Sequence, residues 1–333
     1  MSKKYFAILA AALVSCSLFT GGKAVAAAGD DFPTRPIRMV VAYGPGGGTD
    51  RAIRMFQPYF EKALGQKIVV GNMGGGGTEI ATTSVANKPA DGYTILVTNQ
   101  PDLNWTLAFQ SPAGYDENTF ELMMISQIDP RIIIAAKNSP YTTFTDFIED
   151  AKKKPGKLAV SVGQNSGVHA LALYLRKALN VDYKVVPYDG GGQAAAALIG
   201  NQVDLAIGDA FSRLNLRDSV KCIAVMGSER SKIWPEGEPL DPQLKPYGVS
   251  VPTLNRYQVF AAKREFRQQY PQRYQKLINA FKAASQDPEY LALIRKNFME
   301  DIEVWLTGDQ VVEDLKQQVA FLRTEIKPLL NQK

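Results

Sequence analysis

Three glycine-rich segments in this chain have the residue types that backbone recognition of an anion requires. They are residues 44–50 (GPGGGTD), 72–78 (NMGGGGT) and 187–192 (PYDGGG), and each follows a short apolar run and precedes a segment of helical periodicity. Glycine has no Cβ, so its N–H group can approach a ligand, and the start of a helix adds partial positive charge. The pattern predicts that the chain binds a small anion with its backbone.

The first of these segments matches neither of the common nucleotide-binding fingerprints. No Gly-Lys-Ser/Thr follows it at phosphate-loop spacing, and Thr49 or Arg51 stands where a dinucleotide motif has its third glycine. Thr49 or Asp50 can cap the helix that follows. The alternative to ligand binding, for any one such loop, is a tight turn whose only role is to let a strand and a helix pack. Because the pattern occurs three times in this chain, ligand binding is favoured.

The chain contains a single histidine, His169, which limits the chemistry that it can perform. Any Ser-His-Asp, Cys-His or multi-histidine zinc site would have to include this residue, so most hydrolase and zinc mechanisms are excluded. We therefore expect a binding protein rather than an enzyme, with no catalytic residue, metal or cofactor. The alternative is an enzyme that uses a nucleotide or phosphate at the Gly46 loop, although that loop lacks a phosphate-binding lysine.

Length and composition indicate a globular chain large enough for two domains. Of the 333 residues, 45% are hydrophobic and 21% are charged. Without residues 1–26, 35 basic and 33 acidic residues remain. This balance is too even for a nucleic-acid-binding protein, so we expect no nucleic-acid partner.

Residues 1–26 have the pattern of an export signal, which predicts a periplasmic protein. Two lysines precede an apolar run, and small residues at 24–28 provide cleavage spacing. A transmembrane anchor is the alternative, but the run is short for a membrane span. Residues 13–16 (LVSC) also resemble a lipoprotein cleavage box, in which Cys16 would be lipidated. With either cut Cys222 has no internal partner, so we expect no disulfide and a buried Cys222 on a strand.

Apolar periodicity and turn residues predict alternating strands and helices, which is typical of an α/β protein. In the first part of the chain, we expect strands at 37–42, 67–70 and 93–98 and helices at 51–64 and 79–87. Strands at 123–125 and 132–136 follow a segment, 102–115, without clean periodicity, and then the pattern restarts. It predicts helices at 144–153, 168–179 and 193–199 and strands at 158–162, 184–186, 203–207 and 222–226. A polar stretch at 235–252 leads to a strand at 257–262 and to helices at 271–285, 289–297 and 310–329.

Several motifs in the same order resemble the solute receptors of tripartite tricarboxylate transporters, the Bug/TctC-like extracytoplasmic receptors. The motifs are FPTRPIR at 32–38, YGPGGGTD at 43–50, LGQ at 64–66, the glycine loop at 72–78, PADGYT at 89–94, PGKL at 155–158, Ser166 with His169, VPY at 186–188 and GNQVD at 200–204. The resemblance covers nearly all of the chain after residue 30. Gly44, Gln164 with Asn165, and Asp189 depart from the usual family pattern.

The resemblance implies a two-domain α/β fold of the periplasmic-binding-protein-like type II class, with a ligand cleft between the domains. The implied domains are residues 30–130 plus 253–333 and residues 131–252, and the crossings near Asp129-Pro130 and Val251-Pro252 would form the hinge. Such a protein, as a monomer, captures a small carboxylate by hinge closure and delivers it to the membrane permease of a tripartite transporter.

The family's binding mode, transferred onto the matching positions, points to backbone and short polar side chains on both sides of the cleft. The expected ligand-binding residues are Tyr43, Gly46, Gly47, Gly48, Thr49, Asp50, Gly75, Gly76, Gly77, Thr78, Thr98, Asn99, Ser166, His169, Gly191, Gly192, Gln193 and Asp209.

Some of these residues have structural alternatives. Ser166 is placed to cap the helix that follows it, and His169 in the first turn can bond its own backbone or pack at an interface. Asp50 can act as a helix cap and Asp209 can have a structural role at a strand end. Alternatively, either residue can order a water that bridges to the ligand. An unpaired aspartate beside an anion would repel it, so these roles are favoured over direct contact.

Aromatic residues near the expected cleft make an aromatic carboxylate a candidate ligand beside aliphatic di- and tricarboxylates. They are Tyr43, Trp105, Phe109 and Tyr188. Core packing is the alternative for Trp105 and Phe109.

Overall fold

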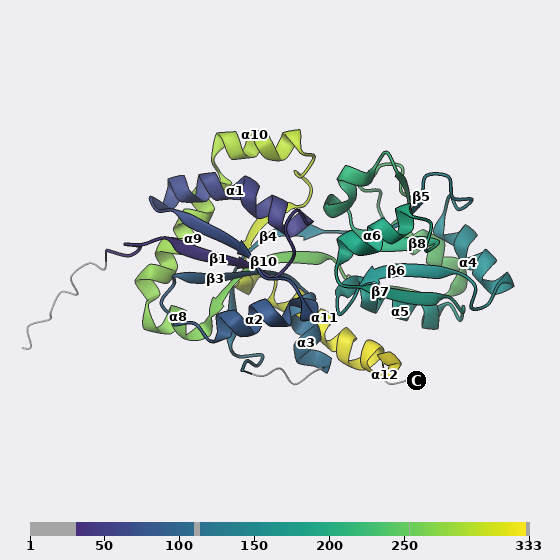
Figure 1. Cartoon of the computed structure of the whole chain (residues 1–333), viewed down its shortest axis with the longest axis horizontal. Helices are drawn as coiled ribbons and strands as arrows, with labels where there is room; N and C mark the ends of the chain where they lie inside the picture. The colour runs from purple at the N-terminus through teal and green to yellow at the C-terminus, as the bar shows by residue number, and fades with distance from the viewer. Residues whose placement is uncertain (1–30, 110–113, 253, 331–333) are drawn as a thin grey trace, which may run out of the picture. The chain divides into compact units, whose positions relative to one another are not determined.

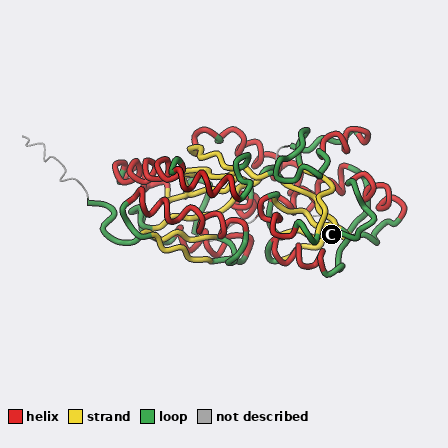
Figure 2. Tube along the Cα trace, turned by 90° about the horizontal axis from the view of Figure 1, so that it is seen from above, coloured by secondary structure: helices red, strands yellow, loops and turns green. Residues whose placement is uncertain are grey.

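The computed structural model describes residues 31–109, 114–252 and 254–330, and of these 33–330 belong to one compact unit, to which the following refers (Figure 1). The expected export signal and Cys16 lie outside the described residues. No helix among the described residues combines the length and apolar character that a membrane crossing needs. Two β-sheets with helices beside them organise this unit (Figure 2).

The first sheet contains six strands in the order β11-β4-β10-β3-β1-β2. The strands β1 (Ile37–Val41), β2 (Ile68–Asn72) and β3 (Thr94–Gln100) run parallel, with β1 between the other two. The strand β10 (Arg256–Lys263) pairs antiparallel with both β3 and β4 (Phe120–Asp129), and β11 (Glu303–Thr307) pairs antiparallel with β4. Because β1, β2 and β3 are parallel, their carboxyl ends and the loops that follow lie at one edge of the sheet.

Helices cover both faces of the first sheet. Alternate residues of β1 and β3, such as Val40 and Leu96, pack with Ala81 and Val85 of α2 (Glu79–Ala86). On the other face, α1 (Gly48–Leu64) contributes the rings of Phe56 and Phe60, which pack with Phe260 of β10, Phe281 of α9 (Pro271–Ser285) and Trp305 of β11. Figure 1 shows α1 and α2 on opposite sides of β1 and β3.

The second sheet contains five strands in the order β7-β6-β8-β5-β9. The strand β6 (Ala159–Gly163) runs parallel to β7 (Lys184–Tyr188) and β8 (Leu205–Asp209), while β5 (Arg131–Ala136) pairs antiparallel with β8 and β9 (Val220–Val225). Its core includes residues of α4 (Phe144–Lys153) and α5 (Gly167–Ala178). The helix α6 (Gly191–Ile199) follows β7, and the carbonyl of its Ala194 accepts a hydrogen bond from Ser161 of β6.

The remaining elements are helices outside the two sheets. The described part of the chain also contains α3 (Asp102–Phe109), α7 (Leu240–Leu244), α8 (Arg264–Gln269) and α10 (Pro288–Lys296). After α11 (Val312–Phe321), a π-helical turn (Leu322–Ile326) leads into α12 (Lys327–Leu330). Phe321, Leu322 and Ile326 pack into the core of the second sheet, so the end of the chain contacts that core.

Most expected elements are present, with shifted ends. The helices at 144–153 and 271–285 match α4 and α9. The segment 102–115 was expected to be irregular, but it begins with α3, and the side chain of Phe109 lies outside the described residues. The elements α7, α8 and β11 were not predicted. Cys222 is buried on β9, as expected, whereas Cys16, the other cysteine of the chain, lies outside the described residues, so the expected lack of a disulfide stays a prediction.

Candidate functional site

The carboxyl ends of parallel strands from both sheets border one cavity of about 730 Å³. From the first sheet, the ends of β1, β2 and β3 and the segments after them line it with residues 42–49, with Gly74, Gly75, Gly77 and Thr78, and with Asn99 and Asp102. From the second sheet, the ends of β6, β7 and β8 and the segments after them line it with residues 163–166 and Val168, with residues 189–193, Ala195, Ala196 and Ile199, and with Gly208, Asp209, Ser212, Arg213, Asn215 and Leu216. Loops at the carboxyl ends of parallel strands are where open α/β sheets bind ligands, so this cavity is the candidate site.

Most of the residues expected to bind a ligand line this cavity together. They are Tyr43, Gly46, Gly47, Gly48, Thr49, Gly75, Gly77, Thr78, Asn99, Ser166, Gly191, Gly192, Gln193 and Asp209. Four expected residues, namely Asp50, Gly76, Thr98 and His169, are not among the lining residues. Ligand contact by any of them stays a prediction.

The start of α1 presents an uncapped helix end to the cavity. Its N-cap is Gly47, which has no side chain, so neither Thr49 nor Asp50 takes the capping position that the sequence suggested. Asp50 instead lies in the first turn and accepts a hydrogen bond from the Gly46 N–H at 2.8 Å. The side chains of Arg54 and Asn72 donate to its other oxygen, each at 2.9 Å. Asp50 therefore holds the first glycine loop in place.

The second glycine loop brings the two sides of the cavity close together. Gly75, Gly76 and Gly77 all have positive φ, and a Cβ on Gly77 would lie 2.6 Å from the Cβ of Asn165 on the opposite side. The next residue, Thr78, also has positive φ, at 84°, and its buried hydroxyl has no hydrogen-bond partner. The chain needs glycine here both for the backbone conformation and for this close approach.

A buried aspartate links the two sides at the start of α5. The carboxylate of Asp102 accepts the N–H of Gly167 at 3.1 Å and the hydroxyl of Tyr43 at 3.0 Å. Burial raises the pKa of Asp102, and burial together with the Asp102 charge raises the pKa of Tyr43. A protein carboxylate thus already occupies the helix start where Ser166 and His169 were expected to meet a ligand.

The two expected residues at this helix start have local partners. Ser166 is the N-cap of α5, but its hydroxyl donates to the carbonyl of Gly163 rather than capping the helix, so the predicted side-chain cap is wrong. The Nδ1 atom of His169 accepts the Asn165 N–H at 3.3 Å, and its ring stacks on Trp105 at 5.3 Å between centroids. Burial lowers the pKa of His169 to about 4, so the imidazole is neutral at pH 7. These contacts match the structural alternative for His169.

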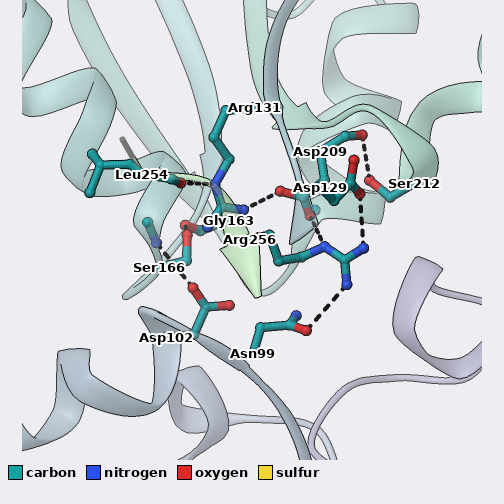
Figure 3. Close-up of polar contacts among 12 residues, drawn as sticks. Asn99, Asp102, Asp129, Arg131, Gly163, Ser166, Asp209, Ser212, Leu254 and Arg256 are labelled. Carbon is teal, nitrogen blue, oxygen red and sulfur yellow. Dashed lines mark hydrogen bonds and ion pairs between the residues drawn. The ribbon is translucent and has the colours of Figure 1, made fainter. Parts of the chain in front are cut away.

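A buried network of two arginines and two aspartates lies beside the cavity, and the sequence did not reveal it. Arg256 of β10 contacts Asp129 at 2.8 Å and Asp209 at 3.5 Å, and Arg131 of β5 pairs with Asp209 (Figure 3). The Nε atom of Arg131 also donates to the carbonyl of Leu254 at 2.8 Å. Burial raises the pKa of Asp209, but the charges of Arg131, Arg256 and Arg213 outweigh this and hold it below the usual value. Asp209 therefore sits at a strand end as an ion-pair partner.

The chemistry available in the cavity favours binding of an anion. Its lining residues include uncapped helix starts and arginines but no lysine and no histidine. Among the described residues, no group of three or more His, Cys, Asp and Glu could hold a metal ion. The arginines of the cavity were missed because nothing in the local sequence distinguishes a buried arginine from a surface one.

Comparison with known proteins places the chain among transport receptors. The model of the family described as "Tripartite tricarboxylate transporter family receptor" matches residues 52–326. A UPF0065 protein in the tcbD-tcbE intergenic region of Pseudomonas sp. (strain P51) is 30% identical over 211 residues. That match spans 62% of this chain and 62% of the relative, which is less than two thirds of its length.

Solved structures share the fold. The periplasmic binding protein BugD is 27% identical, with a TM-score of 0.75, over 90% of this chain and 98% of that one. MatC from Rhodopseudomonas palustris, solved with bound malate, is 23% identical, with a TM-score of 0.74, over 88% of this chain and 99% of that one. The predicted α/β fold, two-domain and periplasmic-binding-protein-like with a cleft between the sheets, is confirmed.

Proposed function

Because the chain belongs to the tripartite tricarboxylate transporter receptor family, we propose that it is an extracytoplasmic receptor for a small carboxylate. It captures the ligand in the cavity between the two sheets and delivers it to a membrane permease. It acts as a binding protein, not as an enzyme, and needs no cofactor.

One observation carries the proposal, namely that two uncapped helix starts border one cavity. The N-cap of α1 is Gly47 and that of α6 is Gly190, and neither start has a side-chain cap. The first N–H groups of a helix have no partner within it, and the helix dipole favours an anion there. A carboxylate supplies the acceptors that both starts lack.

The comparison with MatC supports a carboxylate as the ligand, because that protein has the same fold and holds malate. An aromatic carboxylate stays a second candidate. Of the four aromatic residues that suggested it, Tyr43 lines the cavity, whereas Trp105 is buried against His169. Tyr188 is not among the lining residues.

The domain division at 30–130 plus 253–333 and 131–252 accompanies this proposal, with the crossings near Asp129-Pro130 and Val251-Pro252 as the hinge. The ion pairs of Arg256 with Asp129 and Asp209 lie beside these crossings and support it. We propose that residues 1–26 are cleaved off and that the mature receptor is a periplasmic monomer. The alternative is a lipoprotein that is lipidated at Cys16.

A thermal-shift screen of the mature protein tests the receptor function. The panel contains aliphatic di- and tricarboxylates, amino acids, aromatic mono- and dicarboxylates and nucleotides. We expect at least one carboxylate class to raise the unfolding midpoint by several degrees. A shift with nucleotides alone, or with no carboxylate, would contradict the proposal and favour the enzyme alternative at the Gly46 loop.

A variant that fills the site tests whether binding occurs in this cavity. A Cβ on Gly192 would meet no atom within 4 Å, so Gly192→Asp adds a carboxylate at the start of α6 without a clash. We expect this variant to fold and to lose the carboxylate-induced shift. Gln268→Asp, which adds the same charge on the exposed face of α8, is the matched control and should keep the shift.

A further inference from the structure

We propose that Phe298, in the turn that follows α10, is the residue through which this receptor docks onto its membrane permease. This inference rests on the proposed function and adds to it the surface used for delivery of the ligand. Phe298 is not among the residues that line the cavity, so the inference does not depend on which carboxylate the cavity holds.

The backbone at Phe298 has a conformation that favours glycine. The helix α10 ends in a Schellman motif, in which the N–H of Phe298 donates to the carbonyl of Arg295 at 3.1 Å. The next N–H, that of Met299, donates to the carbonyl of Ile294, also at 3.1 Å. Phe298 takes the left-handed position of this motif, with a φ of 56°. Glycine is the usual residue there because it has no Cβ, and a bulky side chain is strained.

Packing does not explain Phe298 either. Its exposed fraction is 67%, the highest among the large hydrophobic residues that the structure describes. The buried apolar residues of the motif are instead Ile294 and Met299, which are 3% and 1% exposed. Single exposed apolar residues are common on proteins, but here exposure coincides with backbone strain. Glycine would end the helix at least as well, so the phenyl ring is explained by a function outside the fold.

The helix α10 also presents an exposed face beside this turn. Its inner face packs on α1, where the ring of the buried Tyr290 lies 5.3 Å from that of Tyr59 between centroids. Figure 1 shows α10 on the outer side of α1, away from the strands. Leu291 is 39% exposed, and Arg295, one helical turn later, is exposed as well. An apolar and a basic side chain therefore accompany the ring on the outside of the molecule.

The turn after α10 lies close to both sheets. Asp301 forms an ion pair at 2.6 Å with Lys232, which belongs to the segment between β9 of the second sheet and α7. The carbonyl of Ile302 accepts the N–H of Ile128 at 2.8 Å, on β4 of the first sheet and just before the proposed hinge. A partner seated on Phe298 is thus within reach of both sides of the molecule. Since hinge closure would move these sides relative to each other, such a partner can distinguish a loaded receptor from an empty one.

The charges beside Phe298 favour a protein partner over an anionic lipid surface. Arg295 and Lys296 precede the ring, but Glu300 and Asp301 follow it, so the turn has no excess of positive charge. Binding to anionic lipids relies on clusters of basic residues. Aromatic residues and arginine are enriched in protein interfaces, where an aromatic ring fills a pocket of the partner. The protein that a transport receptor has to meet is its permease, so we assign the turn to that partner.

Uptake of ligand into membrane vesicles tests this inference. Right-side-out vesicles are prepared from the host of this protein after deletion of its gene. The mature receptor is added with the carboxylate that raises its unfolding midpoint in the thermal-shift screen. Calorimetry gives the affinity for the carboxylate, and transport gives the receptor concentration at half-maximal uptake. We expect Phe298→Gly to change the affinity less than twofold and to raise the half-maximal concentration at least tenfold.

The stability of the variants separates docking from folding. Because glycine relieves the strain at this position, Phe298→Gly should raise the unfolding midpoint by about 1–3 °C. A residue that serves the fold would lower it. Phe298→Tyr keeps an aromatic ring and should retain most of the uptake. Val69→Thr is the matched control, because it removes a 51% exposed apolar side chain from β2 and should change neither uptake nor affinity.

The possible results separate this inference from the proposed function. An unchanged half-maximal concentration in Phe298→Gly, or a lower unfolding midpoint, would overturn docking at this turn and leave the carboxylate receptor standing. A wild-type dimer that Phe298→Gly abolishes, measured by light scattering, would assign the ring to a second copy and also overturn it. Carboxylate binding without receptor-dependent uptake would overturn delivery to a permease, and docking with it. Failure of every carboxylate to bind would overturn the receptor function itself.

Discussion

The carboxylate of Asp102 accepts the backbone N–H of Gly167 at 3.1 Å, which ties the first turn of α3 to the start of α5. The chain thus fills one helix start of the cavity with its own anion and leaves those of α1 and α6 open. The same carboxylate accepts the Tyr43 hydroxyl, so one side chain holds both walls of the cavity.

Substitution of Asp102 should separate the role of its shape from that of its charge. Burial raises the pKa of Asp102, so the ionised form costs stability at pH 7. We expect Asp102→Asn to lie within about 1 kcal/mol of the wild type, because the amide oxygen can accept the Gly167 N–H, the Tyr43 hydroxyl can accept from the amide NH2 group, and the charge is lost. Asp102→Ala should cost about 2–4 kcal/mol, because Gly167 and Tyr43 lose their buried acceptor. Chemical denaturation at pH 7 measures both values, and equal losses would refute the explanation.

Removal of Arg256 should destabilise the protein strongly. Arg256 is 1% exposed, and its loss would leave Asp129 buried without its ion pair. We expect Arg256→Met to cost about 3–5 kcal/mol of unfolding free energy. The control is Arg267→Met, which breaks the partly exposed pair with Glu121 and should cost about 1 kcal/mol or less. Similar losses of unfolding free energy in the two variants would show that the buried network contributes no more to stability than a partly exposed ion pair does.

His169 should make the protein less stable as the pH falls below about 6.5. Its folded-state pKa of about 4 lies below the usual histidine value of about 6.5, so between these values the unfolded chain binds the proton more readily. Stability is therefore full above pH 6.5 and is lost progressively down to about pH 4. In unfolding midpoints measured across this range, His169→Gln should show a shallower decline than the wild type. An unchanged slope would mean that His169 does not titrate as its burial indicates.

Glu303 should act in the opposite direction over an overlapping range of pH. Burial raises the pKa of Glu303 to about 7, and its carboxylate accepts hydrogen bonds from Tyr290 and Gln127. The folded state therefore favours the protonated form, and its stabilisation is present below pH 4.5 and lost as the pH rises through about 7. Relative to the wild type, Glu303→Gln should gain up to about 3 kcal/mol between pH 4.5 and pH 8. The decisive result is how the difference in stability between variant and wild type changes with pH. The absolute stability is not decisive, because the amide introduced at position 303 faces the Gln127 amide.

Where local periodicity is strong, the sequence predicted the elements closely, as α4 and α9 show. It underestimated β4, which runs from Phe120 to Asp129, because Gln127 and Asp129 look like loop residues. These polar side chains are buried on the strand only because Arg256, far along the chain, donates to both of them. A polar residue whose partner is distant in sequence carries no local signal of burial.

The candidate site also combines features that local sequence predicted with features that depend on distant residues. The glycine loops were recognisable because glycine at a strand-to-helix turn is a local signal, and most of the expected residues line one cavity. His169 and Ser166 were also noticed, but their partners, Asn165 and Gly163, depend on how the turn folds. The arginines Arg51, Arg131, Arg213 and Arg256 were not predicted as site residues, although all four line the cavity.

The sequence alone determined the α/β class, the family resemblance and the backbone loops suited to an anion, because each depends on residue types at short and regular spacing. Only the tertiary structure decided which helix starts remain open and which buried charges pair with one another. Asp102 meets Gly167, and Arg256 meets Asp129 and Asp209, only once the two sheets bring distant segments together. Charge balance in a buried site is a property of the whole arrangement, so no local pattern could reveal it.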